Sequence, residues 1–70
     1  MATLGKEIKK ARIDKGWKQK ELVAETGLSQ KYVSEIERDE VDPRVSIVQL
    51  IARALGVGIE KLVREDVQDV

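Results

Sequence analysis

A short break between two helical patterns constrains the fold more than any other feature of this sequence. A helical pattern over about residues 18–25 is interrupted at Gly27, a residue suited to positive φ. Ser29 then follows as a candidate N-cap for a second helix over about residues 30–38. Such a short gap forces the two helices to cross sharply, which is the layout of a helix-turn-helix.

The remaining apolar residues predict three more helices, because no stretch shows the alternation of a strand. The first helix spans about residues 3–15 and carries one apolar stripe. In the fourth, Asp42 is a candidate cap, Pro43 suits the first turn, and the helix ends near Leu55. The fifth is short and runs over about residues 59–64. Together these elements predict an all-α fold, a compact five-helix domain.

The length of 70 residues suits a single domain, which we expect over residues 1–66, followed by a short tail, 67–70. The chain has no cysteine and no histidine, so disulfides and thiolate or imidazole metal sites are excluded. The acidic residues at 39–42 lack the spacing of a calcium loop. We therefore expect no metal and no cofactor. The absence of an apolar signal core or membrane-length run leads us to expect a cytoplasmic protein with no membrane partner.

Charge is divided unevenly along the chain although the formal net charge is zero. Residues 1–38 hold nine basic and six acidic side chains, whereas residues 39–70 hold four basic and seven acidic ones. A basic working face and an acidic remote face are compatible with this division.

Three blocks of sequence carry a family resemblance. They read "LGKEIKKAR", "QKELVAETGLSQKYVSEIE" and "P-x-V-x-x-V-x-x-IARALGV", and they extend over residues 4–63 in one order and spacing. In these blocks the chain resembles the Cro and phage-repressor (XRE) family of helix-turn-helix regulators. The resemblance implies a repressor-like domain that binds double-stranded DNA sequence-specifically as a homodimer, on a near-palindromic operator with the third helix in the major groove, most often as a repressor.

The resemblance also assigns structural roles. Gln19 looks like the family glutamine that contacts a phosphate and buttresses the recognition helix. Arg12 and Glu37 look like the family's structural pair between the first and third helices. The positions that would lock the two helices of the motif together are apolar: Leu22, Val33 and Ile36. The chain departs from the family at several positions: Lys18 replaces a capping residue, Val23 a small alanine, Asp39 a helix-ending glycine, and Arg44 a capping serine.

One arc of the third helix carries the expected base-reading side chains. At about 100° per residue this polar arc also includes Arg38, and it lies opposite Tyr32, Val33 and Ile36. We expect it to read bases through Gln30, Lys31, Ser34 and Glu35. Two alternatives stay open: the arc is a solvated face, or Lys31 simply pairs with Glu35 four residues later.

The phosphate contacts are expected from residues that flank this arc: Lys18, Gln19, Lys20, Ser29, Tyr32, Arg38 and Arg44. Tyr32 is equally suited to packing with its hydroxyl exposed. Lys20 is equally suited to solubilising charge.

The fourth helix carries two apolar stripes. The expected core stripe comprises Val45, Val48, Ile51, Ala52 and Leu55. A second stripe, on nearly the opposite side, favours a homodimer interface formed by Ile47, Leu50, Ala54, Ile59, Leu62 and Val63. The alternative is that the fifth helix and the valines at 67 and 70 cover this stripe within the chain.

Two classes of function compete. The first is a sequence-specific DNA-binding regulator. The second is a protein-interaction module on the same scaffold, such as an antitoxin-like or adaptor protein with an unknown protein partner. We do not expect an enzyme, because the sequence offers no nucleophile with a base and no set of metal ligands.

Overall fold

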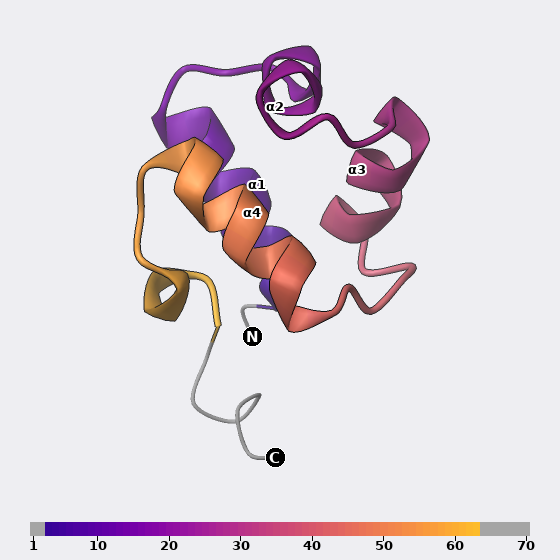
Figure 1. The fold of residues 1–70 in the computed structure, drawn as a ribbon, viewed down its shortest axis with the longest axis vertical. Coiled ribbons are helices and arrows are strands. Elements are labelled where there is room, and N and C mark those ends of the chain that lie inside the picture. The colour runs from indigo at the N-terminus through magenta and orange to yellow at the C-terminus, as the bar shows by residue number, and fades with distance from the viewer. Residues whose placement is uncertain (1–2, 64–70) are drawn as a thin grey trace.

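Four α-helices and one short 3-10 helix form the regular structure of residues 3–63, which are the residues that the computed structural model describes. They are α1 (Leu4–Asp14), α2 (Gln19–Thr26), α3 (Gln30–Glu37), α4 (Val45–Leu55) and η1 (Ile59–Lys61) (Figure 1). The predicted all-α class is confirmed, and these residues contain no strand. No helix among them is long and apolar enough to span a bilayer.

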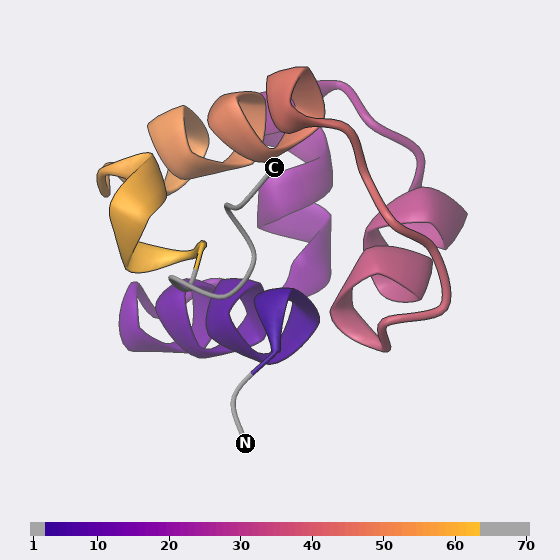
Figure 2. The ribbon, with the colours of Figure 1, turned by 90° about the horizontal axis from the view of Figure 1, so that it is seen from below.

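The helices surround one core. Figure 2 shows α1 and α4 on opposite sides of the molecule, with α2 running between them at one end and α3 packed to the side. α2 contacts both α3 and α4, and α1 also contacts both. Each of the four α-helices contributes to the core, and Leu62 joins it from the turn after η1. The buried apolar side chains are Ile8, Leu22, Val33, Ile36, Val48, Ile51, Ala52, Leu55 and Leu62. The position of α3 is therefore fixed by a core that it shares with the other helices, and not by its contact with α2 alone.

The helix-turn-helix has the predicted layout. Gly27 ends α2 with φ 77°, a left-handed conformation that disfavours a side chain. The Thr26 hydroxyl donates to the Leu22 carbonyl at 2.8 Å and accepts from the Leu28 amide at 3.2 Å, which fixes the turn. Ser29 then caps α3 by accepting from the Tyr32 amide at 3.0 Å. These local bonds set the angle at which α3 leaves α2.

The start of α4 differs from the prediction. The helix begins at Val45, and Arg44 is its N-cap, without a side-chain capping bond. The amides of Ile47 and Val48 donate to the Arg44 carbonyl at 2.9 and 3.1 Å, so Pro43 lies outside the first turn and Asp42 does not cap the helix. Val45 is 65% exposed because the first turn extends beyond the core, and its assignment to the core stripe was wrong.

The fifth helix is shorter than predicted. Of its residues up to 63, Ile59–Lys61 are helical, and they form a 3-10 turn in which the Lys61 amide donates to the Gly58 carbonyl at 2.9 Å. The turn serves to place Leu62 in the core. The predicted helix end near residue 64, the domain boundary at 66, the tail at 67–70 and its two valines lie outside the described residues.

Asp39 has a structural role that the sequence did not predict. It adopts φ 60° two residues after the end of α3, in the position where the resemblance implies a helix-ending glycine. Its carboxylate accepts from the Gly5 amide at 3.0 Å and from the Thr3 hydroxyl at 2.6 Å, at the N-terminus of α1. A Cβ on Gly5 would clash with the Ile36 carbonyl oxygen and lie 2.8 Å from that of Glu37, so this glycine permits the close approach. Asp39 thus joins the end of α3 to the start of α1, where a negative charge is favourable.

Candidate DNA-binding surface

A buried ion pair joins α1 to α3. Arg12 of α1 donates to Glu37 of α3 from Nε at 2.7 Å and from Nη2 at 3.0 Å. Its Nη1 donates to the Trp17 carbonyl at 2.8 Å. Both side chains are buried, and no buried side-chain polar atom in the described part of the chain lacks a partner. The pair implied by the resemblance is therefore present and fully hydrogen-bonded, which buried charges require.

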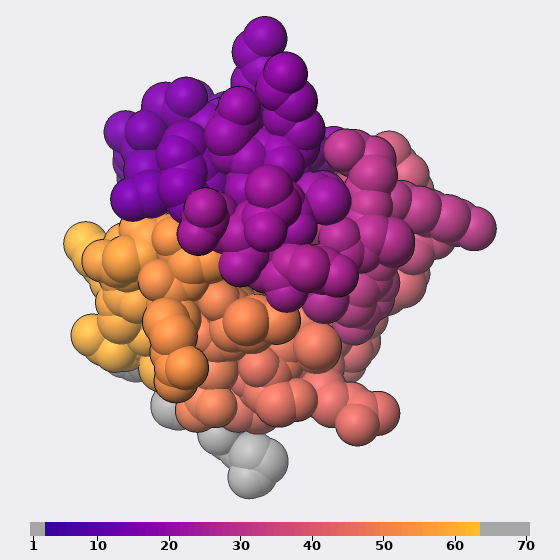
Figure 3. Space-filling view, turned by 45° about the horizontal axis from the view of Figure 1, so that its top comes forward, coloured from indigo at the N-terminus to yellow at the C-terminus, as the bar shows by residue number. Residues whose placement is uncertain are grey.

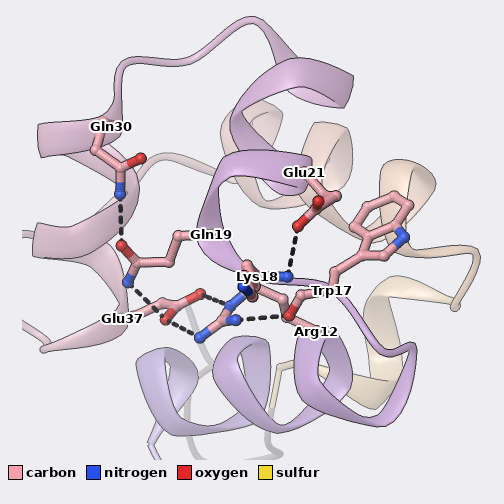
Figure 4. Close-up of polar contacts among 7 residues, drawn as sticks. All are labelled: Arg12, Trp17, Lys18, Gln19, Glu21, Gln30 and Glu37. Carbon is pink, nitrogen blue, oxygen red and sulfur yellow. Dashed lines mark hydrogen bonds and ion pairs between the residues drawn. The ribbon is translucent and has the colours of Figure 1, made fainter.

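The polar network continues from this pair to the surface. Gln19, the first residue of α2, donates from Nε2 to Glu37 Oε1 at 3.1 Å. Gln30, the first residue of α3, donates from Nε2 to Gln19 Oε1 at 2.6 Å. Figure 4 shows the four side chains in one continuous chain of contacts from α1 to the start of α3. The bond between the two glutamines was not predicted from the sequence, since spacing alone does not show that two helix starts meet.

Lys18 precedes α2 without capping it through its side chain. Its backbone amide instead donates to Glu21 Oε1 at 2.7 Å, which is the reciprocal half of a capping box (Figure 4). Glu21 therefore compensates for the missing capping residue. The Lys18 side chain is exposed.

The predicted base-reading residues differ in how far their side chains are exposed. Gln30 and Lys31 are exposed, whereas Ser34 and Glu35 are half-buried. Among the contacts within residues 3–63, Lys31 forms no ion pair with Glu35. On the face shown in Figure 3, α2 lies against α4 and α3, and side chains from the α2 and α3 regions stand out from the surface.

The residues predicted to contact phosphates also differ in exposure. Five of these side chains are exposed: Lys18, Lys20, Ser29, Arg38 and Arg44. Gln19 is half-buried in the network above, and Tyr32 is half-buried against the core.

Arg38 is exposed but already has partners. Its Nη1 donates to Ser34 Oγ at 2.7 Å, and Nε and Nη2 donate to the two carboxylate oxygens of Glu40 at 3.0 and 3.1 Å. The hydrogen bond to Arg38 lowers the pKa of Glu40. The hydrogen bond to Glu40 and its charge raise the pKa of Arg38, with a smaller contribution from Glu35. Arg38 is thus folded back along α3 towards Ser34.

The predicted dimer residues are not all available at the surface. Most of them are half-buried: Ile47, Leu50, Ala54, Ile59 and Val63. Leu62 is 1% exposed and belongs to the core, so its assignment to an interface was wrong. The η1 turn directs this side chain inward, which the apolar periodicity did not show.

No group of metal-ligating side chains is present among residues 3–63. Asp39 and Glu40 instead bind a helix start and an arginine. Two of the three acidic residues after α3, Asp39 and Glu40, are therefore held by contacts within the protein.

Comparison with known proteins agrees with this geometry. A family model described as helix-turn-helix matches residues 8–62. An immunity repressor protein of Bacillus phage phi105 is 34% identical over 64 residues, which is 91% of this chain and 44% of the repressor. A hypothetical transcription factor of Neisseria meningitidis serogroup B is 38% identical over 61 residues, 87% of this chain and 58% of that protein. The chain therefore spans about half the length of these two relatives.

Solved structures show the same fold. The restriction-modification controller protein C.AhdI from Aeromonas hydrophila superposes with a TM-score of 0.81 at 27% identity, covering 84% of this chain and 89% of the controller. The structure of a hypothetical transcription factor from Neisseria gives a TM-score of 0.80 at 34% identity, covering 90% of this chain and 74% of the other. Since the family model matches most of the chain, the protein belongs to the Cro and phage-repressor (XRE) family of DNA-binding helix-turn-helix transcriptional regulators.

Proposed function

We propose that the protein is a sequence-specific repressor that binds a near-palindromic operator in the cytoplasm as a homodimer, with α3 in the major groove. The observation that carries this proposal is the network that holds Gln30. Its amide is fixed by Gln19, which is fixed in turn by the buried pair of Glu37 and Arg12. A solvated polar side chain needs no such support, whereas a base-reading side chain gains specificity from it.

The network also determines which way the Gln30 amide faces. Glu37 as a carboxylate only accepts, so Gln19 donates to it and turns its own oxygen towards Gln30. Gln30 therefore donates one N–H to Gln19 and retains its amide oxygen and a second N–H. These are the two groups that pair with N6 and N7 of adenine in the major groove. We infer that Gln30 reads an adenine.

The neighbouring residues complete the proposed interface. Lys31 is exposed and suited to guanine, while Ser34 and Glu35 lie further along the arc. The exposed side chains that flank the arc supply phosphate contacts: Lys18, Lys20, Ser29 and Arg44. Gln19 retains one N–H that can donate to a phosphate. We propose that the Tyr32 hydroxyl contacts a second phosphate.

Within residues 3–63, Glu35 is the acidic residue of α3 that forms no ion pair. Glu37 pairs with Arg12, and Glu40 pairs with Arg38. We propose that Glu35 accepts from a cytosine amino group. Glu35→Ala should then relax preference at one base pair in a binding selection. Tighter binding to all sequences alike would instead identify Glu35 as a simple source of repulsion.

The proposed dimer uses the second stripe of α4. Ile47, Leu50 and Ala54 remain half-buried in the isolated chain, as do Ile59 and Val63. Half-buried apolar side chains on one surface favour association with a second copy. Two copies would then read half-sites about one helical turn, roughly 34 Å, apart.

Selection of bound sequences from random double-stranded DNA, with the mass of the complex measured in parallel, tests this proposal. We expect a palindromic consensus, a dimer on each site, and affinity that falls steeply as salt rises. Binding that is absent or insensitive to salt would contradict it. Recovery of a stoichiometric non-self protein on the α4 stripe, with no selected DNA, would support the protein-interaction module instead.

A further inference from the structure

The arrangement around Arg38 differs from that of a simple phosphate clamp. A clamp needs only a positive charge that is free to follow the DNA backbone. Arg38 instead has three hydrogen bonds, one to Ser34 Oγ and two to Glu40, although the side chain is 59% exposed. An exposed arginine normally loses conformational entropy when it is held in this way. The contacts therefore fix the direction of the guanidinium rather than bury it.

The guanidinium of Arg38 points towards the predicted base-reading arc of α3. Ser34 lies one helical turn before Arg38 and one turn after Gln30, so the three residues form a row along α3. Because Nη1 of Arg38 is 2.7 Å from Ser34 Oγ, the guanidinium lies over this row. A side chain at the helix end that pointed away to the flank could not make this contact.

The guanidinium still has donors to offer. It carries five N–H bonds, and three of them serve Ser34 and Glu40. One N–H remains on each terminal nitrogen. A pair of N–H groups on adjacent nitrogens matches O6 and N7 of guanine, the most common specific contact in the major groove.

We propose that Arg38 reads a guanine, and that Ser34 and Glu40 are positioning residues that aim its guanidinium at the base. This inference rests on the proposed function, because it assumes that α3 enters the major groove. It assigns Glu40 a favourable role in specificity despite its negative charge. It also replaces the sequence-based expectation that Arg38 contacts phosphate.

The test is a competition among DNA duplexes that carry each single base-pair change in the selected site. For Arg38→Ala we expect the preference for guanine at one position of each half-site to fall roughly tenfold, with the other positions unchanged. For Glu40→Gln we expect a smaller loss, roughly two- to fivefold, at the same position. Asp42→Asn is the matched control, because it removes one exposed charge from the same loop and should leave the preference intact.

Other results would overturn the inference. Uniform weakening of all duplexes by Arg38→Ala would identify a phosphate clamp. Uniform strengthening by Glu40→Gln, with an unchanged pattern of preference, would show that Glu40 only competes with DNA for Arg38. Both results leave the proposed function intact. A wild-type protein that selects no DNA sequence would contradict the proposed function and this inference together.

Discussion

Two arginine–glutamate pairs in this molecule have nearly the same geometry and opposite surroundings. Arg12 and Glu37 meet at 2.7 and 3.0 Å, and Arg38 and Glu40 at 3.0 and 3.1 Å, each through two hydrogen bonds. The side chains of the first pair are 9% and 2% exposed, and those of the second are 59% and 52% exposed. Burial, rather than contact distance, therefore separates a pair that supports the fold from one that is available to a ligand.

The position of each pair in the chain agrees with this division. The buried pair joins two helices across 25 residues, and its carboxylate also holds Gln19. The exposed pair joins residues two apart at the end of α3. The first pair fixes where α3 lies, and the second affects only the side chain at its end.

The largest expected effect comes from breaking the buried pair. Glu37→Ala leaves the Arg12 guanidinium buried without its carboxylate, which costs about 3–5 kcal/mol of unfolding free energy. Urea denaturation followed by circular dichroism measures this loss. Replacing both residues with apolar side chains, Arg12→Met with Glu37→Leu, should recover most of the stability. A loss below about 1 kcal/mol for Glu37→Ala would show that the pair does not support the fold.

An intermediate effect is expected at the link between the buried pair and the surface. Gln19→Ala removes one hydrogen bond to Glu37 and should lower stability by about 1 kcal/mol. It also releases Gln30, so the preference for adenine at one position should fall while the protein stays folded. Gln19→Glu is a useful second variant because it places a like charge beside Glu37. An unchanged preference for adenine in Gln19→Ala would show that Gln30 does not depend on its hydrogen bond to Gln19 for reading the base.

A small effect on stability is expected from the exposed pair. Arg38→Ala should leave the urea midpoint nearly unchanged at neutral pH, because solvent and salt screen the interaction. The variant should nevertheless alter DNA binding. The comparison between the two pairs would fail if Arg38→Ala and Glu37→Ala destabilised the fold to a similar degree.

The smallest expected effect is a change with pH. The folded-state pKa of Glu40 is lowered from 4.5 by its bond to Arg38. The stability that this group contributes is therefore present above about pH 4.5 and is lost as pH falls through the lower folded-state pKa. Titration by NMR should show a lowered pKa in the wild type and a return towards the ordinary value in Arg38→Ala. Identical titration curves would show that the pair does not form in solution.

Much of the framework could be predicted from the sequence because it depends on neighbouring residues. Gly27 and Ser29 define the turn locally, and the break between the two helices is short enough to fix their crossing. The pair of Arg12 and Glu37 followed from the family register, since separation along the chain carries no signal for a contact between helices.

The predictions that were wrong concern residues whose burial or contacts depend on how the helices pack together. The spacing of apolar residues placed Val45 in the core and left Leu62 for an interface. The first turn of α4 instead extends beyond the core, and η1 turns Leu62 inward. Asp42 before Pro43 matched a helix start, but the first bonds go to the Arg44 carbonyl. Periodicity identifies a face and does not show how far the core beneath it extends.

The residues of the candidate DNA-binding surface were predicted from their type and position, but their contacts with one another were not predicted. The bonds from Gln30 to Gln19 and from Arg38 to Glu40 depend on side-chain directions that a helical wheel does not give. One usable signal was present: Ser34 and Arg38 are four residues apart, a spacing at which side chains on a helix meet.

The central claim is that the buried network presents Gln30 for reading an adenine. It is tested most directly by repeating the DNA selection with Gln30→Ala beside the wild type. We predict that both select the same site except at one base pair in each half-site, where the variant loses its preference for adenine. An unchanged consensus, or equal weakening at all positions, would contradict the claim.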